Sequence, residues 1–343
     1  MSRFTLFLTL LLLVPVLSMA QADKLLRKLR MDSTSFGHKV MLADSILTRS
    51  YNKGSYDTTY IRRPRHPFTV KVRYNVSGSG IYTKGQIEGH DYRSRLTTSY
   101  QNTASLAFAY RGIAVAVAVN PAKLFGKDKS KSFNFTLYAN RYGMDLAYQD
   151  SRQYSGWGEY DGVRETFTTD IVRTRLTDMS AYYAFNYRKF SYPAALTQSY
   201  IQQRSAGSWL LALSCLNGNM EMSKSEIDDR VPEVNLRLLD IGVGGGYGYN
   251  LCLPHRWMIH ASVLPTIIVG PFNKMTVEGE KHHIKYSFPE FIVTERLSFL
   301  HYINDRNFLN LTFVNYSTIQ GNYKNIRNVH NKWRLRVCYG MRF

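Results

Sequence analysis

The sequence predicts an all-β protein, a transmembrane antiparallel β-barrel of about twelve strands, within a range of roughly ten to fourteen. Three observations lead to this prediction. The amino terminus has the pattern of a secretory signal. Apolar residues recur at every second position in many short segments. The end of the chain continues that alternation up to an aromatic carboxy-terminal residue.

The first 20 residues predict a signal peptide. Arg3 supplies a charge before the apolar run from Phe4 to Val14, and Ser18-Met19-Ala20 has the small residues of a cleavage site. Residues 21–67 are polar and basic with short helical stretches, and we expect them to form a periplasmic N-terminal extension. The barrel domain then occupies residues 68–343. Its predicted location is the bacterial outer membrane.

Alternating segments separated by polar turns fill the chain from Phe68 onward. The first runs to Val76, and two more flank Arg111-Gly112 and predict a hairpin. The others lie at 133–137, 144–148, 167–173, 179–187, 209–215, 241–253, 257–263, 291–299 and 309–313. We expect a loop at 154–158 and a long polar connection at 188–208, where Pro193 interrupts any strand pairing. Long and short connections do not alternate in this pattern.

The carboxy-terminal segment has a very regular alternation. Side chains at every second position of a strand share a face, and six apolar residues do so here: Trp333, Leu335, Val337, Tyr339, Met341 and Phe343. A long strand that ends in Phe resembles the closing strand of outer-membrane barrels, where it is the usual assembly signal. We therefore expect an assembly strand and, as a partner, the barrel-assembly machinery. An amphipathic edge strand of a soluble protein is the alternative.

The chain is strongly basic, with a formal charge of +19. A signal peptide argues against nucleic acid as the partner, and the charges are spread singly along the predicted strands. Five basic residues lie opposite the apolar positions and are candidates for facing the lumen: Lys71, Arg73, Arg334, Arg336 and Arg342. A basic lumen favours a small anionic solute, and outer-membrane lipid and lipopolysaccharide are expected around the barrel.

The sequence predicts no catalytic residue, cofactor or metal site. The glycine run 242–248 lacks a Walker lysine and a βαβ context, so it favours close strand packing over a phosphate site. His282 and His283 are adjacent and point to opposite faces of a strand. Three widely spaced cysteines indicate neither disulfides nor a metal site. His260 and Ser262 share a strand face and come closest to a hydrolase site.

Six short motifs stand out as a set: 57–61, 120–126, 190–195, 198–200, 204–209 and 244–250. The third is specific, because Ser-Tyr-Pro-Ala-Ala beside Gln-Ser-Tyr is rare by composition. Around it lies a family-motif loop with Ser191, Tyr192, Pro193, Gln198 and Arg204. Together the motifs resemble DUF4421, a family of uncharacterised outer-membrane β-barrel-like proteins of Bacteroidota. The resemblance implies a barrel and supplies no catalytic residue.

The predicted function is therefore that of a non-enzymatic outer-membrane barrel: a pore, a scaffold or a partner-binding barrel with a basic lumen. Two alternatives stay open. A lipid-modifying enzyme embedded in the barrel wall would need a nucleophile and a base near the membrane interface. A soluble secreted β protein that binds a ligand would share the strand pattern. The substrate, the oligomeric state and the exact strand number do not follow from the sequence.

Overall fold

The structure is a computed structural model that describes residues 55–87, 90–110, 113–119, 131–152, 154–169, 172–223, 233–282, 288–321 and 327–343. The predicted signal peptide and most of the predicted extension lie outside these residues. Within the described ranges, no helix combines the length and apolar character needed to cross a membrane. Residues from Ser55 to Phe343 belong to one unit.

The described residues form strands and one short helix. Their bounds are β1 (Ile61–Arg62), β2 (Phe68–Ile87), β3 (His90–Thr98), β4 (Gln101–Tyr110), β5 (Ile113–Val119), β6 (Lys131–Tyr138), β7 (Tyr142–Ser151), β8 (Tyr154–Tyr160), β9 (Val163–Thr169), β10 (Val172–Ala184), α4 (Tyr192–Leu196), β11 (Ile201–Gln202), β12 (Ala206–Met222), β13 (Val234–Leu253), β14 (Trp257–Pro271), β15 (Lys274–Val277), β16 (Glu280–His282), β17 (Phe291–Tyr302), β18 (Asn307–Gly321) and β19 (Arg327–Arg342).

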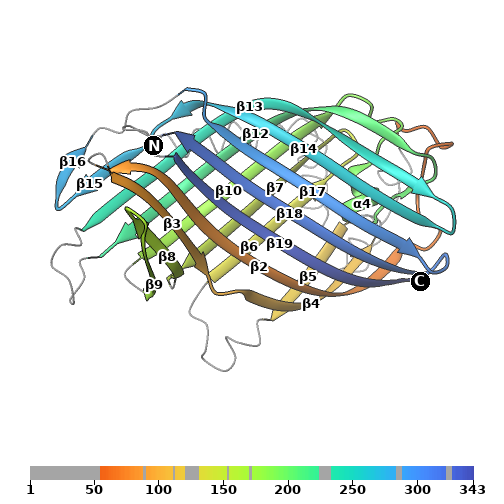
Figure 1. Cartoon of the computed structure of the whole chain (residues 1–343). Helices are drawn as coiled ribbons and strands as arrows, with labels where there is room; N and C mark the ends of the chain where they lie inside the picture. Colours follow the sequence, from red (N-terminus) through yellow and green to blue (C-terminus); the bar gives the residue numbers. More distant parts are fainter. Residues whose placement is uncertain are drawn as a thin grey trace, which may run out of the picture. The chain divides into compact units, whose positions relative to one another are not determined.

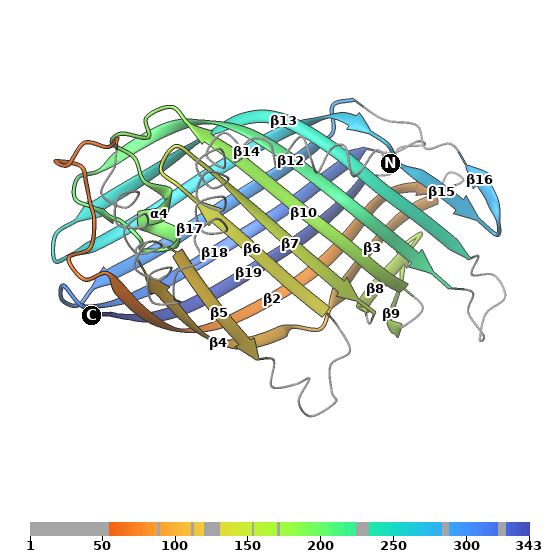
Figure 2. The same ribbon diagram turned by 180° about the vertical axis from the view of Figure 1, so that it is seen from behind.

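The strands pair antiparallel in a sheet that curls back on itself (Figures 1 and 2). Eight strands follow one another around it, each paired with the next: β10, β12, β13, β14, β17, β18, β19 and β2. β2 also pairs with β3, and β3 pairs with β8. β8 follows β7 along the chain, and β7 pairs with β10, which closes the ring. Among the described residues, the ring has ten positions where it closes through β3 and β8. Toward the terminal end, β4, β5, β6 and β7 lie between β2 and β10, which gives twelve positions. β5 and β6 widen the sheet beside β4 and β7. The predicted β-barrel is confirmed.

Apolar side chains face outward and many polar side chains face inward, which is the reverse of their distribution in a soluble protein. Outward positions carry an apolar belt: Val72, Leu106, Phe108, Leu211, Val243, Val263, Leu297, Phe299, Leu309, Leu311 and Val337. Inward positions include many polar and charged groups: Lys71, Asp145, Asp178, Asn250, His260, Arg296, Asn310, Lys332 and Arg342. An apolar exterior around a polar interior is typical of a transmembrane barrel.

The two ends of the barrel differ in their connections. At the terminal end, Phe68 and Phe343 exchange backbone hydrogen bonds, and the connections 139–141, 254–256 and 303–306 are short. The opposite, hairpin end carries the β2–β3, β8–β9 and β15–β16 hairpins, and the stretches of sequence that separate β12 from β13 and β14 from β17 are long. The sequence pattern does not reveal that short and long connections alternate along the chain. The reason is that interruptions divide single long strands into β3 and β4, β7 and β8, and β9 and β10.

Glycines allow close backbone approach at two places. The loop predicted at 154–158 is wrong, since these residues form β8. At Gly156 a Cβ atom would lie 1.8 Å from the Arg95 carbonyl oxygen, so the pairing of β8 with β3 requires glycine. On β13, a Cβ at Gly244 or Gly246 would lie 2.3 or 1.9 Å from a carbonyl oxygen of β14. The glycine run 242–248 therefore serves strand packing, as the sequence predicts.

The unit begins thirteen residues before Phe68, where the sequence places the start of the barrel domain. Strand β1 pairs with β11, and the Asp57 backbone N–H donates to the Arg188 carbonyl at 2.8 Å. Hydrogen bonds from the Thr59 hydroxyl and backbone N–H lower the pKa of the Asp57 carboxyl. Residues 57–62 thus pack against the connection between β10 and β12.

Candidate functional site

The connection between β10 and β12 folds into the terminal end of the barrel. We call residues 188–203 the inner segment. Phe190, Tyr192, Ala194 and Ala195 in this segment have no exposed surface. Figure 2 shows α4 within the ring of strands. The inner segment contains Ser191, Tyr192, Pro193 and Gln198 of the predicted family-motif loop, so that motif lies inside the barrel.

Local sequence explains the short helix in the inner segment. The Ser191 hydroxyl caps α4 by accepting a hydrogen bond from the Ala194 N–H at 3.2 Å, and it donates to Asn140 Oδ1 at 2.6 Å. Pro193 occupies the first turn, where its missing N–H costs no hydrogen bond. The helix ends at Thr197, and Gln198 adopts a φ of 53°. That left-handed residue turns the chain back toward the end of the barrel.

Inward-facing side chains of the barrel wall hold the carbonyl oxygens at the end of α4. Lys71 Nζ donates to the Thr197 carbonyl, and Arg342 Nη2 donates to the Gln198 carbonyl at 3.0 Å. The Ala195 carbonyl accepts from Ser298 Oγ at 2.9 Å and from the Gln198 side chain at 3.0 Å. The Ala195 carbonyl is among those that a helix leaves without partners at its end, and the Thr197 and Gln198 carbonyls follow directly after the helix. The wall therefore anchors the inner segment at a point where the segment needs donors.

A second polar group links the inner segment to β13 and β14. Asn250 Nδ2 donates to the Ser191 carbonyl at 2.9 Å and to Gln202 Oε1 at 3.0 Å. Its Oδ1 must then accept from His260 Nδ1, 2.7 Å away. This leaves His260 Nε2 as the acceptor for Ser262 Oγ at 3.1 Å. The result is an Asn–His–Ser relay whose members are nearly completely buried.

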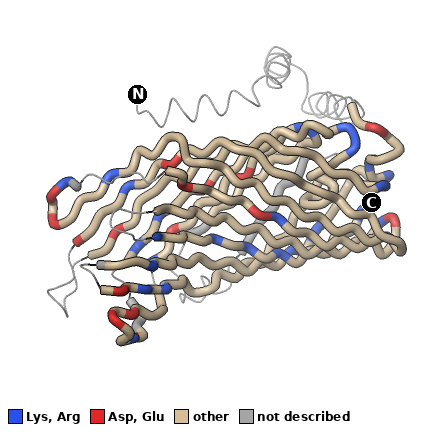
Figure 3. The backbone as a smooth tube through the Cα atoms, turned by 45° about the horizontal axis from the view of Figure 1, so that its top comes forward, with Lys and Arg blue, Asp and Glu red and all other residues tan. Residues whose placement is uncertain are grey.

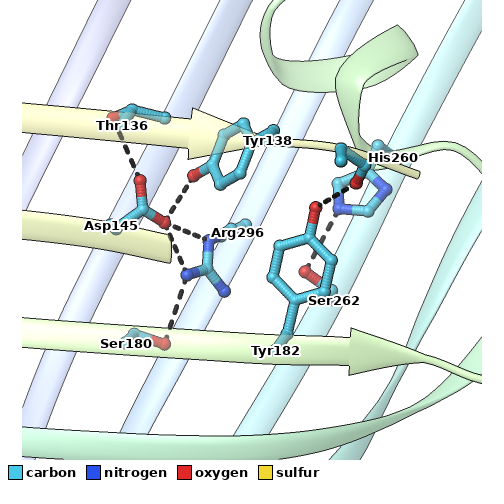
Figure 4. A network of polar contacts seen from close by, with 9 residues as sticks. Thr136, Tyr138, Asp145, Ser180, Tyr182, His260, Ser262 and Arg296 are labelled. Carbon is cyan, nitrogen blue, oxygen red and sulfur yellow. Dashed lines mark hydrogen bonds and ion pairs between the residues drawn. The ribbon is translucent and has the colours of Figure 1, made fainter. Parts of the chain in front are cut away.

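A buried ion pair lies on the other side of the same interior region (Figure 4). Arg296 Nη2 and Nε lie 2.7 and 3.2 Å from Asp145 Oδ2. Thr136 and Tyr138 donate their hydroxyls to Asp145. Arg296 is also the register partner of Ser262, and its Nη1 is buried without a hydrogen-bond partner among the described residues. The ion pair thus borders the relay.

The five predicted basic residues do not form one solvated set. Lys71 and Arg342 hold the inner segment, and Arg336 Nε donates to Asn75 Oδ1 at 2.7 Å. Arg73 and Arg334 lie opposite Cys338 and Ser77 in the register of β2 and β19 and are partly buried. Acidic residues share the interior, for example Asp178, which pairs with Lys332 at 3.1 Å. The interior is therefore mixed in charge rather than simply basic. The charged positions along the strands can be followed in Figure 3.

The remaining predicted residues lie at the surface of the terminal end or on the outward face. Val337, Tyr339, Met341 and Phe343 are exposed, whereas Trp333 and Leu335 are half-buried. Arg204 of the family-motif loop is exposed, and its guanidinium lies 5.9 Å from the centre of the Tyr60 ring. Arg204 therefore stands apart from the buried residues of the motif.

A cavity of about 300 Å³ opens at the terminal end beside the inner segment, and Gln202, Met258, Tyr302 and Arg342 are among its lining residues. The cysteines Cys215, Cys252 and Cys338 are free thiols. In the described ranges, no group of three or more His, Cys, Asp and Glu residues is arranged to hold a metal ion.

Sequence reasoning missed most of the interior partners. Asp145, Arg296 and Asn310 are not among the predicted site residues, and Asn250 enters only as the last residue of the motif 244–250, although each lies in the inward phase of an alternating strand. The inward phase of the alternation is the sequence signal that could have identified these residues. Their pairing across strands follows from the register of the sheet, which the sequence pattern does not specify.

The fold is similar to that of solved outer-membrane barrels. The outer membrane protease OmpT of Escherichia coli matches with a TM-score of 0.40 at 4% identity, over 84% of this chain and 100% of that one. OprG of Pseudomonas aeruginosa matches with a TM-score of 0.26 at 6% identity, over 84% and 99%. The translocator domain of the Neisseria meningitidis autotransporter NalP gives 0.33 at 10% identity, over 95% and 97%.

The sequence matches none of the curated proteins with which it was compared. A family model does match, over residues 55–343, and its description is a domain of unknown function, DUF4421. This match confirms the resemblance carried by the six motifs, and it begins where the described unit begins. The chain belongs to the DUF4421 family.

Proposed function

We propose that this protein is an outer-membrane barrel whose interior is held closed at its terminal end by the inner segment, and that it conducts small anionic solutes when the segment is released. The observation that carries this proposal is the set of hydrogen bonds from wall residues Lys71, Arg342 and Ser298 to the carbonyl oxygens at the end of α4. These bonds use side chains, and the pairing of β11 with β1 lies outside the barrel sheet, so the segment can leave without breaking the barrel sheet.

The exterior supports the membrane location. Aromatic side chains flank the apolar belt at the terminal end, as Trp209 and Trp257 do, and at the hairpin end, as Tyr82 and Tyr100 do. An apolar exterior of this extent disfavours the soluble alternative. The predicted signal peptide supplies a route across the inner membrane, and the outward aromatic face of β19 suits the barrel-assembly machinery. Because short turns of such barrels face the periplasm, the terminal end is assigned to the periplasmic side.

The anion preference follows from what the inner segment covers. Lys71, Arg336 and Arg342 lie near the terminal end, and two of them donate to the segment. Release of the segment would remove those carbonyl acceptors and leave positive side chains on the β2 and β19 side of the opening. Basic side chains that line a pore favour anions. The buried acids Asp145 and Asp178 already have cationic partners in Arg296 and Lys332.

Planar-bilayer conductance tests the proposal. The purified wild-type barrel is expected to conduct poorly. A variant with residues 190–201 replaced by a flexible Gly-Ser linker is expected to conduct continuously and to select chloride over potassium. Lys71→Met/Arg342→Met should give intermittent opening, because it removes two anchors and keeps the segment. Arg204→Ala is the matched control, since Arg204 is a basic residue of the same connection that is exposed.

Heat-modifiable mobility on a gel establishes that each variant is a folded barrel. A folded linker variant that does not conduct would overturn the gated-conduit proposal. A wild-type protein that conducts as well as the linker variant would also overturn it. Recovery of the protein in the soluble periplasmic fraction would contradict the membrane location itself.

A second candidate function, acyl-ester hydrolysis, is supported by the Asn250–His260–Ser262 relay. The hydrogen-bond order fits a serine nucleophile, a histidine base and an orienting amide. Arg296 Nη1 could stabilise a developing oxyanion, because Arg296 is the register partner of Ser262. The same relay also anchors the Ser191 carbonyl, so a purely structural role explains it equally.

Labelling with a fluorophosphonate separates the two roles. A hydrolase is expected to react at Ser262 in the linker variant, where the inner segment no longer covers the relay, and to lose labelling in His260→Ala. A folded linker variant that takes no label would leave the relay with a structural role.

A further inference from the structure

A groove opens on the outer surface of the barrel near the hairpin end. β2 pairs with β4 up to Ser77 and with β3 from Gly80, so the neighbouring strand is interrupted between these two points. The groove has a volume of about 470 Å³. Its walls carry four aromatic side chains: Tyr82, Tyr100, Trp157 and Trp333.

The groove faces away from the interior. Tyr82 and Tyr100 are 38% and 69% exposed. Tyr82, Arg95 and Trp157 are register partners in one row across β2, β3 and β8. Register partners lie on the same face of a sheet, so Arg95 and Trp157 share the outward face with Tyr82.

A basic row lies one step closer to the hairpin end. Across β19, β2, β3, β8 and β9, consecutive register partners are Arg327, Lys84, Arg93, Glu159 and Arg164. Four of these five residues are basic. The Arg164 guanidinium lies 4.0 Å over the Trp157 ring, which directs it toward the groove wall. With Arg95 in the groove itself, this edge carries a concentrated positive charge.

The floor of the groove is small and polar. Asn331, Gly80 and Thr97 are register partners there. A Cβ atom on Gly80 would make an ordinary contact of 3.4 Å with the Leu96 carbonyl oxygen, so backbone packing does not require glycine. The absence of a side chain at Gly80 instead leaves open space between the aromatic walls. Amide and hydroxyl groups beside aromatic rings suit a ligand with sugar hydroxyls.

The apolar belt continues below the groove toward the middle of the barrel. Val76, Leu335, Phe313 and Leu297 are consecutive register partners on β2, β19, β18 and β17. From the middle of the barrel outward, the order is therefore apolar strip, aromatic groove with a polar floor, and basic row. A lipid with acyl chains, sugars and phosphates presents the same groups in the same order.

We propose that this groove binds a phosphorylated glycolipid of the outer leaflet, of the lipid A class. Its acyl chains lie along Leu335 and Val76, its sugars lie between Tyr82 and Trp333, and a phosphate accepts hydrogen bonds from Arg95 and Arg93. This inference rests on the membrane location proposed above, with the hairpin end outside, and is independent of any conduction through the barrel.

Native mass spectrometry of the purified full chain in detergent tests the proposal, with diphosphoryl lipid A as the probe. The wild type is expected to retain one lipid, and Arg93→Ala/Arg95→Ala to bind at least about tenfold more weakly. Arg237→Ala/Lys274→Ala is the matched control: Arg237 and Lys274 are exposed register partners on β13 and β15, away from the groove. The control should bind like the wild type.

Two further measurements separate the contribution of charge to lipid binding from that of the groove's shape. Gly80→Leu fills the groove, keeps every charge and is expected to weaken binding as well. Monophosphoryl lipid A should bind more weakly than the diphosphoryl form. An equal loss in the Arg237→Ala/Lys274→Ala control, or equal binding of phosphatidylglycerol, would overturn the proposal. Heat-modifiable mobility on a gel first shows that each variant is folded. Cell fractionation tests the membrane location separately, so a failure of the glycolipid proposal is distinguished from a failure of the membrane location.

Discussion

At the scale of single residues, the barrel interior depends on charges that are placed beside their partners. Arg296 and Asp145 are both almost fully buried, and their ion pair is reinforced by hydroxyls from Thr136 and Tyr138. Burying such a pair costs desolvation energy that the mutual attraction only partly offsets. The pair is therefore expected to contribute more to the specificity of packing than to net stability.

Arg296→Met is expected to destabilise the barrel by about 3–5 kcal/mol, because it leaves the Asp145 carboxylate buried without its cation. Asp145→Asn/Arg296→Met removes both charges and should recover a large part of that loss. Urea unfolding in detergent micelles, followed by tryptophan fluorescence, measures both values. A double variant less stable than Arg296→Met would contradict this explanation.

The sequence predicts which residues face inward but not which of them meet. Lys71 and Arg342 follow the predicted phase, yet their acceptors lie in the connection between β10 and β12, more than a hundred residues away from each. Alternation carries information about faces only. The partner of an inward residue depends on strand register and on the path of a connection, neither of which is encoded in a local pattern.

At the scale of elements, the pairing of β13 with β14 depends on the absence of side chains at particular positions. Gly244 and Gly246 approach the carbonyl oxygens of Pro265 and Val263 more closely than any Cβ atom permits. The close packing of β13 against β14 therefore explains the glycine run 242–248. The same cause explains why residues 154–158 form β8 rather than a loop, since Gly156 makes the approach to β3 possible.

Gly246→Ala is expected to destabilise the barrel by about 3 kcal/mol, because the new methyl group would overlap the Val263 carbonyl oxygen and push β14 away. Gly80→Ala is the control, since a Cβ atom there makes only ordinary contacts. The temperature at which the compact band is lost on a gel compares the two. Equal midpoints would show that the strands separate at Gly246 without cost.

The strand elements could be predicted because each half-exposed strand repeats a two-residue pattern. The inner segment could not, because its burial comes from Ser298, Asn310 and Asn250 on three distant strands. Its motif marked it as distinctive, and Pro193 excluded it from a central strand, but nothing local distinguishes a polar surface loop from one that fills a barrel. Polar side chains fit both places when the barrel interior is itself polar.

At the scale of the whole molecule, the apolar belt is the feature that separates a membrane barrel from a soluble one. Both kinds of protein share alternating strands, and only the environment of the outward face differs. The same outward substitution therefore has different consequences in lipid and in water.

Leu297→Arg tests that difference. Leu297 is 40% exposed in the belt, between Ala261 and Phe313 in the register. In a bilayer an outward arginine at this depth is expected to cost about 2–4 kcal/mol, whereas an exposed position in water tolerates the change within about 0.5 kcal/mol. Val163→Arg is the matched control, because Val163 is 68% exposed in the β8–β9 hairpin. Folding into lipid vesicles at a series of urea concentrations measures both variants.

A loss of stability confined to Leu297→Arg places the belt in lipid, since the two positions differ in their distance from the hairpin tip and hardly at all in chemistry. Equal behaviour of the two variants would mean that both side chains face water, and the proposals for the conduit and for the glycolipid groove would lose their common foundation.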